Sequence, residues 1–380
     1  MIRVAMIIRS TLYTAKGGDT VQALQTAKNL ILNGIKVDIK LTSELIEYDE
    51  YDLLHFFNIT RPADILCHIK KSRKPFVVST ILIDYSEYDK YYRKGIAGML
   101  FRFLSADGIE YMKAISRRLL GKDKLMSLPY IWKGHRRSII EILEQAALLL
   151  PNSDSEYERL KQLYGCNGNY RIIPNGIDPA LFRFNQKIEK DPLLVLCVGR
   201  IEGIKNQLNL IRAINNSKYK LVIIGSPAQN QLSYYRTCRE IAGPNISFIE
   251  YLPQEELVCY YQRARVHVLP SWFETTGLSS LEAAAMGCSI VITDKGDARE
   301  YFGSDAAYCV PASPESIYTA VEKAASLPLN TGLQSKIITR YTWHQATRST
   351  VEAYETIIKK HGTKNRNTGN QGHPKQLWRL

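Results

Sequence analysis

Apolar and polar positions alternate along the first half of the chain in two different rhythms. Residues 3–8 form a nearly continuous apolar run, as expected for a strand buried on both faces of a sheet. After a pair of glycines, apolar residues recur every three or four positions over residues 21–31, which predicts a helix that ends at an Asn-Gly pair. Further strands are predicted at residues 36–41, 52–57, 76–79 and 148–150. Strands that alternate with helices favour a parallel sheet with crossover connections.

A helix start and a cluster of turn residues close this half. Ser153 and Glu156 have the spacing of a capping box, which predicts a helix through residue 163. Residues 171–174 are predicted as the last strand. The Asn-Gly and Asp-Pro pairs of residues 175–179 are strong turn signals, so we place a domain boundary between residues 174 and 175.

The second half repeats the rhythm, with strands predicted at 193–198, 220–224, 246–249, 266–269 and 289–293, and helices at 206–214, 255–264, 278–286 and 314–325. The pattern predicts two doubly wound α/β domains, 1–174 and 175–342, that face each other across a cleft. Ligands of such sheets bind beyond the carboxyl ends of the strands. A last helix, 343–360, has an apolar stripe and is expected to pack back onto the first domain. Residues 361–380 are polar and basic and are predicted to be a disordered tail.

Composition narrows the class of protein. The 380 residues are 45% hydrophobic and 23% charged, which excludes collagen-like, largely disordered and disulfide-scaffold proteins. No apolar run approaches the ~20 residues of a spanning helix. The first apolar run is too short for a signal peptide, which favours a cytoplasmic location. The seven cysteines form no C-x-x-C pair, so zinc ribbons and redox motifs are disfavoured.

The net charge of +13 is concentrated in two segments. Residues 90–137 hold twelve basic residues against three acidic ones, and residues 359–380 hold six basic residues and no acidic one. Aromatic and apolar residues alternate with the basic ones in 90–137. That combination suits the anionic surface of a membrane, here the inner face, and predicts peripheral association. The alternative is a solvated pair of helices whose aromatic residues belong to the core.

The strongest chemical signal lies between residues 270 and 287. A strand is followed by Glu274, Gly277 and Glu282 around a helix start. The N-terminus of a helix offers free N–H groups to a phosphate, and Gly277 lets the backbone approach closely. The two carboxylates can accept hydrogen bonds from hydroxyls, so the pattern suits a polyhydroxylated ligand beside a phosphate. The alternative is that Glu282 only caps its own helix, because Ser279 and Glu282 also have capping-box spacing.

Two cations lie at the expected ligand-binding edge of the same domain. Arg200 follows the first strand of the second half and Lys205 comes five residues later. An arginine fork and a lysine point charge are common partners of a pyrophosphate. The alternative is a pair of solvated surface cations.

This ordered set, from Gly199-Arg200 through Lys205 and Glu274-x7-Glu282 to Gly287, resembles the retaining glycosyltransferases of family 4, which have the GT-B fold. The resemblance implies that Arg200 and Lys205 bind the donor diphosphate. It implies that Glu274 contacts the transferred sugar and that Glu282 holds the nucleotide ribose. Glu274, Arg200 and Lys205 are therefore the expected catalytic residues.

The resemblance also implies further donor-binding positions, less specifically. The backbone at Gly277 and Leu278 matches the stretch beside the sugar and phosphate. Tyr251 and Leu252 lie where the family lines its base pocket. Gly17 and Gly18 match the N-terminal loop that approaches the donor phosphate and the acceptor.

One departure from the family concerns the segment after the fourth strand. Many members carry a histidine and an acidic residue there, whereas residues 79–85 contain no histidine. No catalytic imidazole is assigned for this reason. Asp84 is a candidate for contact with the acceptor. The alternative is that it only stabilises a turn. His55 is a second candidate, with a packed core histidine as the alternative, and Asn58 is a third.

The function implied by the resemblance is retaining transfer of a sugar from a nucleotide-diphosphate sugar to a saccharide acceptor. We expect a lipid-linked acceptor and a role in surface polysaccharide or glycolipid synthesis. The family's chemistry proceeds by front-face attack through an oxocarbenium-like state, without a covalent enzyme nucleophile. No D-x-D triplet occurs, which predicts that neither a metal nor another cofactor is needed. The sequence leaves the sugar, base, acceptor, linkage and oligomeric state open.

The sequence disfavours two other classes of function. An epimerase-like enzyme of the same fold would need a catalytic acid pair at the cleft, and no such pair is identified. A nucleic-acid-binding protein is disfavoured because the chain has no RNP-like, helix-turn-helix or zinc motif, and its charge outside the two basic segments is slightly acidic.

Overall fold

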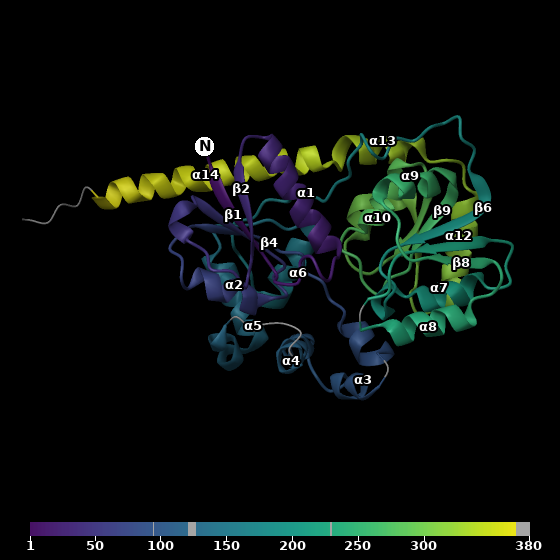
Figure 1. The fold of residues 1–380 in the computed structure, drawn as a ribbon, viewed down its shortest axis with the longest axis horizontal. Coiled ribbons are helices and arrows are strands. Elements are labelled where there is room, and N and C mark those ends of the chain that lie inside the picture. The colour runs from purple at the N-terminus through teal and green to yellow at the C-terminus, as the bar shows by residue number, and fades with distance from the viewer. Residues whose placement is uncertain (94, 121–126, 229, 370–380) are drawn as a thin grey trace, which may run out of the picture.

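The computed structural model describes residues 1–93, 95–120, 127–228 and 230–369, and for residues 362–369 the backbone alone. Two α/β domains lie side by side, and the long helix α14 (Trp343–Gly369) runs from the second domain across the first (Figure 1). This is the predicted arrangement of two doubly wound domains with a returning C-terminal helix.

The N-terminal domain is built on a parallel sheet of strand order β2-β1-β3-β4-β5. Its strands are β1 (Arg3–Ile8), β2 (Lys36–Leu41), β3 (Leu53–Phe57), β4 (Phe76–Ser79) and β5 (Leu148–Leu149). One face packs against α1 (Gly18–Leu32) and α14. The other packs against α2 (Pro62–Ile69), α5 (Leu128–Gln145) and α6 (Asp154–Tyr164). Because both faces are covered, β1, β3 and β4 are apolar at almost every position.

The C-terminal domain is built on a second parallel sheet, of order β11-β10-β9-β6-β7-β8. Its strands are β6 (Asp191–Val198), β7 (Lys220–Ile224), β8 (Ile246–Ile249), β9 (Ala264–Leu269), β10 (Ser289–Thr293) and β11 (Ala306–Cys309). Its helices cover both faces. One face holds α9 (Gln254–Arg263), α10 (Leu278–Ala285), α11 (Ala298–Phe302) and α13 (Thr331–Arg340). The other holds α7 (Gln207–Ile214), α8 (Leu232–Ile241) and α12 (Pro314–Ser326).

The predicted strands and helices are present, mostly within two residues of their expected bounds, with two differences. Residues 171–174 are not a strand. The chain there only runs beside β5, with an isolated bridge between Leu149 and Tyr170. Helix α14 continues to Gly369, so residues 361–369 are helical rather than part of a disordered tail, while residues 370–380 lie outside the described part. Further elements have no counterpart among the predicted ones: β11, α2, α3 (Ile96–Phe101), α4 (Ala106–Leu119), α5, α8, α11 and α13.

The chain passes between the domains twice, and the two passages lie side by side. The N–H of Ile177 donates to Tyr341 (2.9 Å), and the N–H of Trp343 donates back to Ile177 (3.1 Å). A Cβ on Gly176 would lie 2.3 Å from the carbonyl carbon of Thr342, so only glycine fits at this approach.

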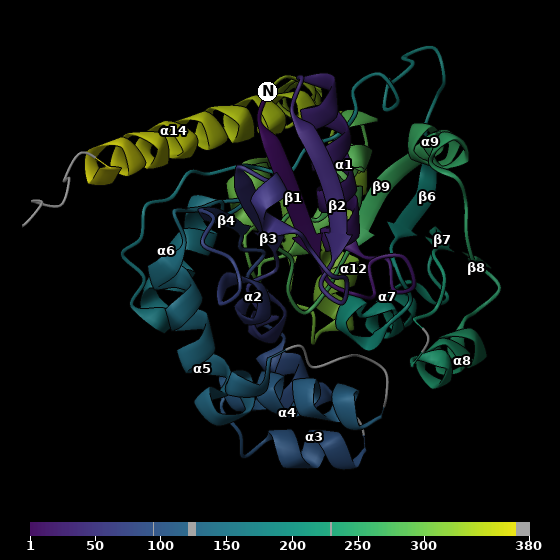
Figure 2. The ribbon, with the colours of Figure 1, turned by 60° about the vertical axis from the view of Figure 1, so that its left-hand side comes forward.

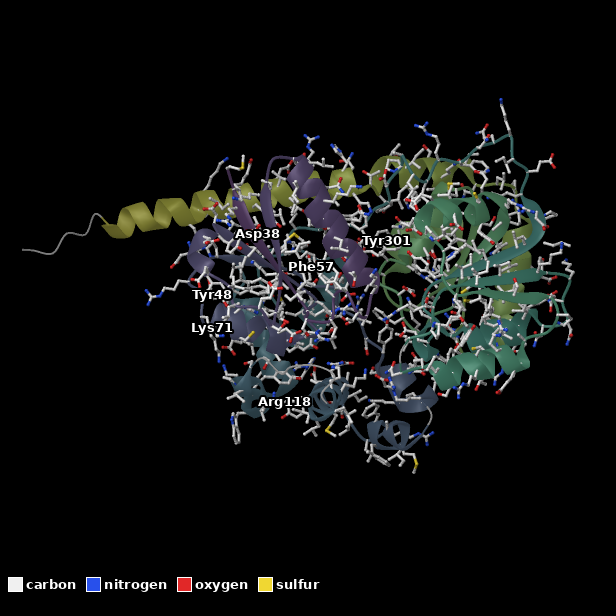
Figure 3. The ribbon with its side chains drawn as sticks, in the orientation of Figure 1. Asp38, Tyr48, Phe57, Lys71, Arg118 and Tyr301 are labelled. Carbon is white, nitrogen blue, oxygen red and sulfur yellow. The ribbon has the colours of Figure 1, made fainter. Side chains whose placement is uncertain are left out.

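Polar contacts also join the two domains at the N-terminus of α6. The Glu300 carboxylate accepts hydrogen bonds from the N–H groups of Asp154 (2.9 Å) and Ser155 (3.0 Å), where a helix dipole favours a negative charge. Arg159 of α6 pairs with Asp297 of the C-terminal domain. Tyr301, labelled between the domains in Figure 3, donates from its hydroxyl to the carbonyl of Asn152 (2.8 Å). These contacts fix the facing edges of the two sheets.

Of the two hydrogen bonds that define the predicted capping box of α6, the structure has one. The Ser153 hydroxyl accepts a hydrogen bond from the N–H of Glu156 (3.1 Å), as an N-cap should. The Glu156 carboxylate instead accepts from the N–H groups of Asn152 (2.8 Å) and Leu82 (2.8 Å) and from the Thr80 hydroxyl. Burial raises the pKa of Glu156 to about 7. The residue therefore ties α6 to the loop after β4.

Candidate functional site

The candidate site lies where the strand order of the C-terminal sheet reverses. β6 and β9 are neighbours, and the chain leaves them toward opposite edges of the sheet. Such a switch point opens a crevice at the carboxyl ends of the strands. Gly199-Arg200 follows β6 and residues 270–274 follow β9, so the sequence motifs meet there.

Lys205 and Glu274 form a close ion pair in this crevice. The distance between Lys205 Nζ and Glu274 Oε1 is 2.5 Å, and the side chains are 20% and 7% exposed. The backbone of Glu274 is held on both sides, because its N–H donates to Lys295 (3.1 Å) and its carbonyl accepts from Asp297 (2.8 Å). The carboxylate is thus fixed beside a cation at the sheet edge.

Arg200 lies nearby with a carboxylate partner that the sequence analysis missed. Its Nη2 is 2.7 Å from Glu202 Oε1, and the Arg200 side chain remains 40% exposed. An exposed guanidinium can still turn toward an anionic ligand. No motif marked Glu202, although it lies between the two predicted cations.

Helix α10 begins at Leu278 after Gly277, whose φ is +70°. A Cβ at Gly277 would lie 2.9 Å from Ile292 Cδ1, so both conformation and space favour glycine. No side chain of the described residues caps this helix. Its first N–H groups can therefore serve an anion.

Glu282 does not cap α10, so the capping-box alternative is wrong. The carboxylate accepts hydrogen bonds from the Tyr261 hydroxyl (2.9 Å) and from Gln254 Nε2 (3.4 Å), both on α9. Burial raises the pKa of Glu282 to about 7, and the two hydrogen bonds oppose the shift. Glu282 is therefore a partly buried acceptor beside the helix start.

The N-terminal glycine loop reaches this site from the other domain. Gly17 is the N-cap of α1, and a Cβ on it would lie 3.8 Å from Arg200 Cζ. A Cβ on Gly18 would lie 3.9 Å from Leu278 Cδ1. The structure thus brings together the two predicted cations, Glu274, the start of α10 and the glycine loop.

Tyr251 and Leu252 follow β8, two strands away from the switch point. Tyr251 is 73% exposed, and Leu252 packs against the core of the C-terminal domain. Their assignment to a base pocket remains a prediction.

His55 does not belong to the site, which corrects its assignment as an acceptor residue. It is 1% exposed and hydrogen-bonds to Tyr354 of α14 (2.6 Å) and to Ser79 (2.9 Å). Burial lowers the pKa of His55 to about 3, so the imidazole is neutral near pH 7. It is a core histidine that joins the sheet to α14.

Asn58 and Asp84 lie after the carboxyl ends of β3 and β4. Asn58 has a φ of +70°, and its Oδ1 accepts from the N–H of Thr60 (3.1 Å). Asp84 is exposed, and its Oδ1 accepts from the N–H of Ser86 (2.8 Å). Both side chains stabilise their own turns, and their contact with an acceptor remains a prediction.

Tyr85 is a residue that the sequence analysis overlooked beside Asp84. Its ring packs edge-on against Phe273, with centroids 6.4 Å apart. Burial raises the pKa of Tyr85 well above its usual value, and the charges of Glu274 and Glu202 add to the shift. The residue is a neutral phenol that the N-terminal domain contributes beside Phe273. No sequence motif distinguishes Tyr85 from any other tyrosine in a loop.

The α3–α5 region, defined as residues 96–120 and 127–145, lies on the opposite side of the molecule from α14 (Figures 1 and 2). Large apolar side chains are exposed on it, including Phe103 (90%) and Trp132 (88%). Phe101 and Tyr130 are buried, so only part of the aromatic content belongs to the surface. Tyr92, just before this region, stacks on Trp272 of the C-terminal domain at 3.8 Å.

The basic residues of the segment 90–137 are partly neutralised. Lys113 and Arg93 both pair with the buried Asp89 (2.5 Å each), which lies one residue before the predicted basic segment. Arg118, labelled on α4 in Figure 3, is exposed. Lys94, Lys122 and Lys124 lie outside the described residues. Within the part of the chain that the structure describes, no helix is long and apolar enough to cross a membrane.

Comparison with known proteins supports this reading of the C-terminal domain. Residues 179–341 match the model of the family described as "Glycosyl transferases group 1". A D-inositol 3-phosphate glycosyltransferase of Acidothermus cellulolyticus is 27% identical over an alignment of 179 positions. The alignment covers 41% of this chain and 40% of that protein. The chain thus spans about two-fifths of that curated relative. An uncharacterized glycosyltransferase of Methanocaldococcus jannaschii is 22% identical over 91% of this chain and 96% of its own length.

Solved structures establish the fold. Sucrose-phosphate synthase of Thermosynechococcus elongatus has a TM-score of 0.64 at 16% identity, covering 98% of this chain and 100% of that one. The Anabaena protein HepE in complex with UDP-glucose has a TM-score of 0.61 at 13% identity, covering 97% and 100%. The two facing parallel sheets are those of the GT-B fold, as the resemblance implied.

Proposed function

We propose that this protein is a retaining glycosyltransferase of family 4 that transfers a sugar from a nucleotide-diphosphate donor to a saccharide acceptor. The observation that carries the proposal is the meeting of Arg200, Lys205, Glu274 and the uncapped start of α10 at one switch point. The group 1 match covers the same domain and supports the proposal.

The cations have one role in this mechanism, which is to stabilise the leaving diphosphate. Negative charge accumulates on the diphosphate as the bond to the sugar breaks. Lys205 and the first N–H groups of α10 are proposed to bind that charge, together with Arg200 once its exposed guanidinium turns from Glu202 toward the diphosphate. The arrangement supplies fixed positive charge from the protein itself, so we propose that transfer needs no metal or other cofactor.

Glu274 has a different role, beside the transferred sugar. Its carboxylate forms an ion pair with Lys205, and its backbone is held by two hydrogen bonds. A fixed carboxylate can accept hydrogen bonds from sugar hydroxyls and stabilise positive charge developing on the ring. The acceptor hydroxyl attacks from the face that the diphosphate leaves and gives its proton to the departing diphosphate oxygen, so the sugar keeps its anomeric configuration.

Glu282 lies deeper and is proposed to hold the ribose. Tyr261 and Gln254 orient its carboxylate, and ribose hydroxyls would donate to the remaining lone pairs. Tyr251 and Leu252 are proposed to border the base. Asn58 and Asp84 are proposed for the acceptor side, because they follow strands of the N-terminal domain.

We propose further that the α3–α5 region binds the anionic inner face of a membrane peripherally, where the enzyme meets a lipid-linked saccharide for surface polysaccharide or glycolipid synthesis. Phe103 and Trp132 expose apolar area beside basic side chains, the combination that favours an interfacial position. Replacing both with serine should reduce sedimentation with phosphatidylglycerol vesicles by about tenfold. Leu45→Ser, at a side chain that is 96% exposed outside this region, is the matched control. Unchanged sedimentation of the double variant would contradict the membrane proposal.

The transfer itself is tested by following donor cleavage. Purified protein is incubated with UDP-, GDP- and ADP-sugars in EDTA, and the first-formed product is read by NMR. The proposal predicts cleavage of one donor family with the anomeric configuration retained. A product of inverted configuration, or a strict need for a divalent cation, would contradict it.

A further inference from the structure

Arg9 is a buried charged residue that the donor motifs do not include. It comes directly after β1, at the carboxyl end of the strand, and is 9% exposed. A buried charge is stable only when it is paired and hydrogen-bonded. Its partners therefore indicate what the residue is for.

Within the described part of the chain, each hydrogen-bond partner of the Arg9 guanidinium belongs to the glycine loop or the first turn of α1. Nε donates to Asp19 Oδ2 (2.7 Å), and Nη2 donates to Asp19 Oδ1 (3.0 Å). Nη1 donates to the carbonyl (2.8 Å) and hydroxyl (2.8 Å) of Thr11. Nη2 also donates to the carbonyl of Ala15 (2.7 Å) and the hydroxyl of Thr20 (3.0 Å). One planar fork thus holds both ends of the loop.

Part of the loop is anchored independently of the Arg9 side chain, because Leu12 is buried in the core of the N-terminal domain and the N–H of Ala15 donates to the carbonyl of Thr11 (3.0 Å). Residues 13–16 are exposed and form turns rather than a strand or helix. The loop nevertheless ends at Gly17 and Gly18, which lie against Arg200 and Leu278 of the other domain. Arg9 therefore connects the carboxyl end of β1 to Ala15 and Asp19, which lie on either side of these glycines in the chain.

The ion pair between Arg9 and Asp19 also affects the charge near Arg200. Its hydrogen bonds to Arg9 lower the pKa of Asp19 against the effect of burial, so it is ionised. Asp19 and Arg200 both lie beside Gly17, because a Cβ on this glycine would be 3.0 Å from Asp19 Oδ1 and 3.8 Å from Arg200 Cζ. Without Arg9, an unpaired carboxylate would compete with a diphosphate for Arg200.

We propose that Arg9 is a positioning residue for the transfer reaction. It fixes the loop of residues 10–18 over the donor site, and it neutralises Asp19 so that Arg200 is available to the diphosphate. This inference rests on the proposed function for its catalytic consequence, but the order of the loop can be measured without any ligand.

Three variants separate the two effects. Arg9→Lys keeps the charge and loses the fork, so transfer should fall about 100-fold through misplacement of the loop, with UDP affinity within about threefold of wild type. Arg9→Met leaves Asp19 unpaired, so UDP affinity should fall about tenfold. Arg9→Met/Asp19→Asn removes both charges, so UDP affinity should recover while transfer stays low. Arg3→Lys, at the other end of β1 and paired with Asp38 and Glu50, is the control and should behave as wild type.

Hydrogen exchange of residues 10–18 in the full chain gives the ligand-free readout. Exchange should accelerate at least tenfold in Arg9→Lys and the double variant, but not in Arg3→Lys. Unchanged exchange in Arg9→Lys, or a double variant that binds UDP no better than Arg9→Met, would overturn the inference. Wild-type protein that binds and cleaves no nucleotide sugar would instead overturn the proposed function, with the exchange result still deciding whether Arg9 orders the loop.

Discussion

The substitution Glu274→Gln keeps the size of the side chain and removes its charge. The lost interaction is the ion pair with Lys205, 2.5 Å away. Coulomb attraction at this distance is about 2 kcal/mol in water and about 7 kcal/mol at an effective dielectric constant of about 20. Desolvation of both groups offsets most of the larger value. Because Lys205 is partly exposed and can take up water, we expect the free energy of unfolding to fall by about 2 kcal/mol.

Catalysis should suffer more than stability. If Glu274 stabilises charge on the transferred sugar only in the transition state, kcat should fall by about 10² to 10³. Nucleotide affinity should stay within about threefold of wild type or increase, because a negative charge near the diphosphate has been removed. The measurements are the kcat and KM of donor cleavage, UDP binding by calorimetry, and the melting temperature, which should fall by roughly 4–8 °C.

Glu141→Gln is the matched control for the ion pair. Glu141 lies 2.5 Å from Lys133 on α5, away from the switch point. Its substitution should leave kcat unchanged. A Glu274→Gln variant with full kcat and only a lowered melting temperature would refute the catalytic role and leave a structural ion pair.

The remaining predictions concern the other parts of the site. The pKa of Glu282 is about 7, above its ordinary value of 4.5, so the carboxyl ionises late and becomes a stronger acceptor for ribose as pH rises. UDP affinity should therefore rise from pH 6 to pH 8 in the wild type, while Glu282→Gln should bind more weakly and without this pH dependence. The same pKa shift means that the folded state holds more protons than the unfolded state between about pH 4.5 and 7. The contribution of Glu282 to the free energy of unfolding should therefore fall as pH rises through that window. Denaturant titrations of the Gln variant should show a smaller loss of stability than those of the wild type. Gly277→Ala should lower both the melting temperature and UDP affinity, because φ is +70° and a Cβ would meet Ile292. Gly165→Ala, with φ +68° and open space around it, should lower only the melting temperature, and equal binding losses in the two variants would contradict the local role of Gly277.

The proximity of the main residues of the candidate site could be predicted because these residues follow strand ends closely in the chain. Arg200 and Glu274 each follow a buried strand within a few residues, and parallel strands bring their carboxyl ends to one edge. Side-chain partners at long range could not be predicted in the same way. The capping-box spacing of Glu282 suggested a local role, whereas its partner Tyr261 comes from a different helix.

The N-terminal domain was harder to interpret for the same reason. His55 has the position of a cleft residue, but its burial depends on Tyr354, 299 residues away. The helices of residues 96–145 expose apolar side chains to solvent, so their hydrophobic pattern does not follow a single buried stripe. Arg9 and Tyr85 carry no motif, and only the folded structure shows their neighbours.

The central claim is that the C-terminal domain binds a nucleotide-diphosphate sugar through protein groups alone. Thermal shift with UDP, GDP, ADP and their common sugar conjugates, in the presence of EDTA, tests it most directly. A ligand that binds only the folded state raises the melting temperature by mass action, by several degrees at 100 times its Kd. We expect such a shift with one nucleotide family in the wild type and a much smaller one in Glu282→Gln. No shift with any nucleotide, with EDTA or with Mg²⁺, would contradict the donor site assigned to Arg200, Lys205, Glu274 and Glu282.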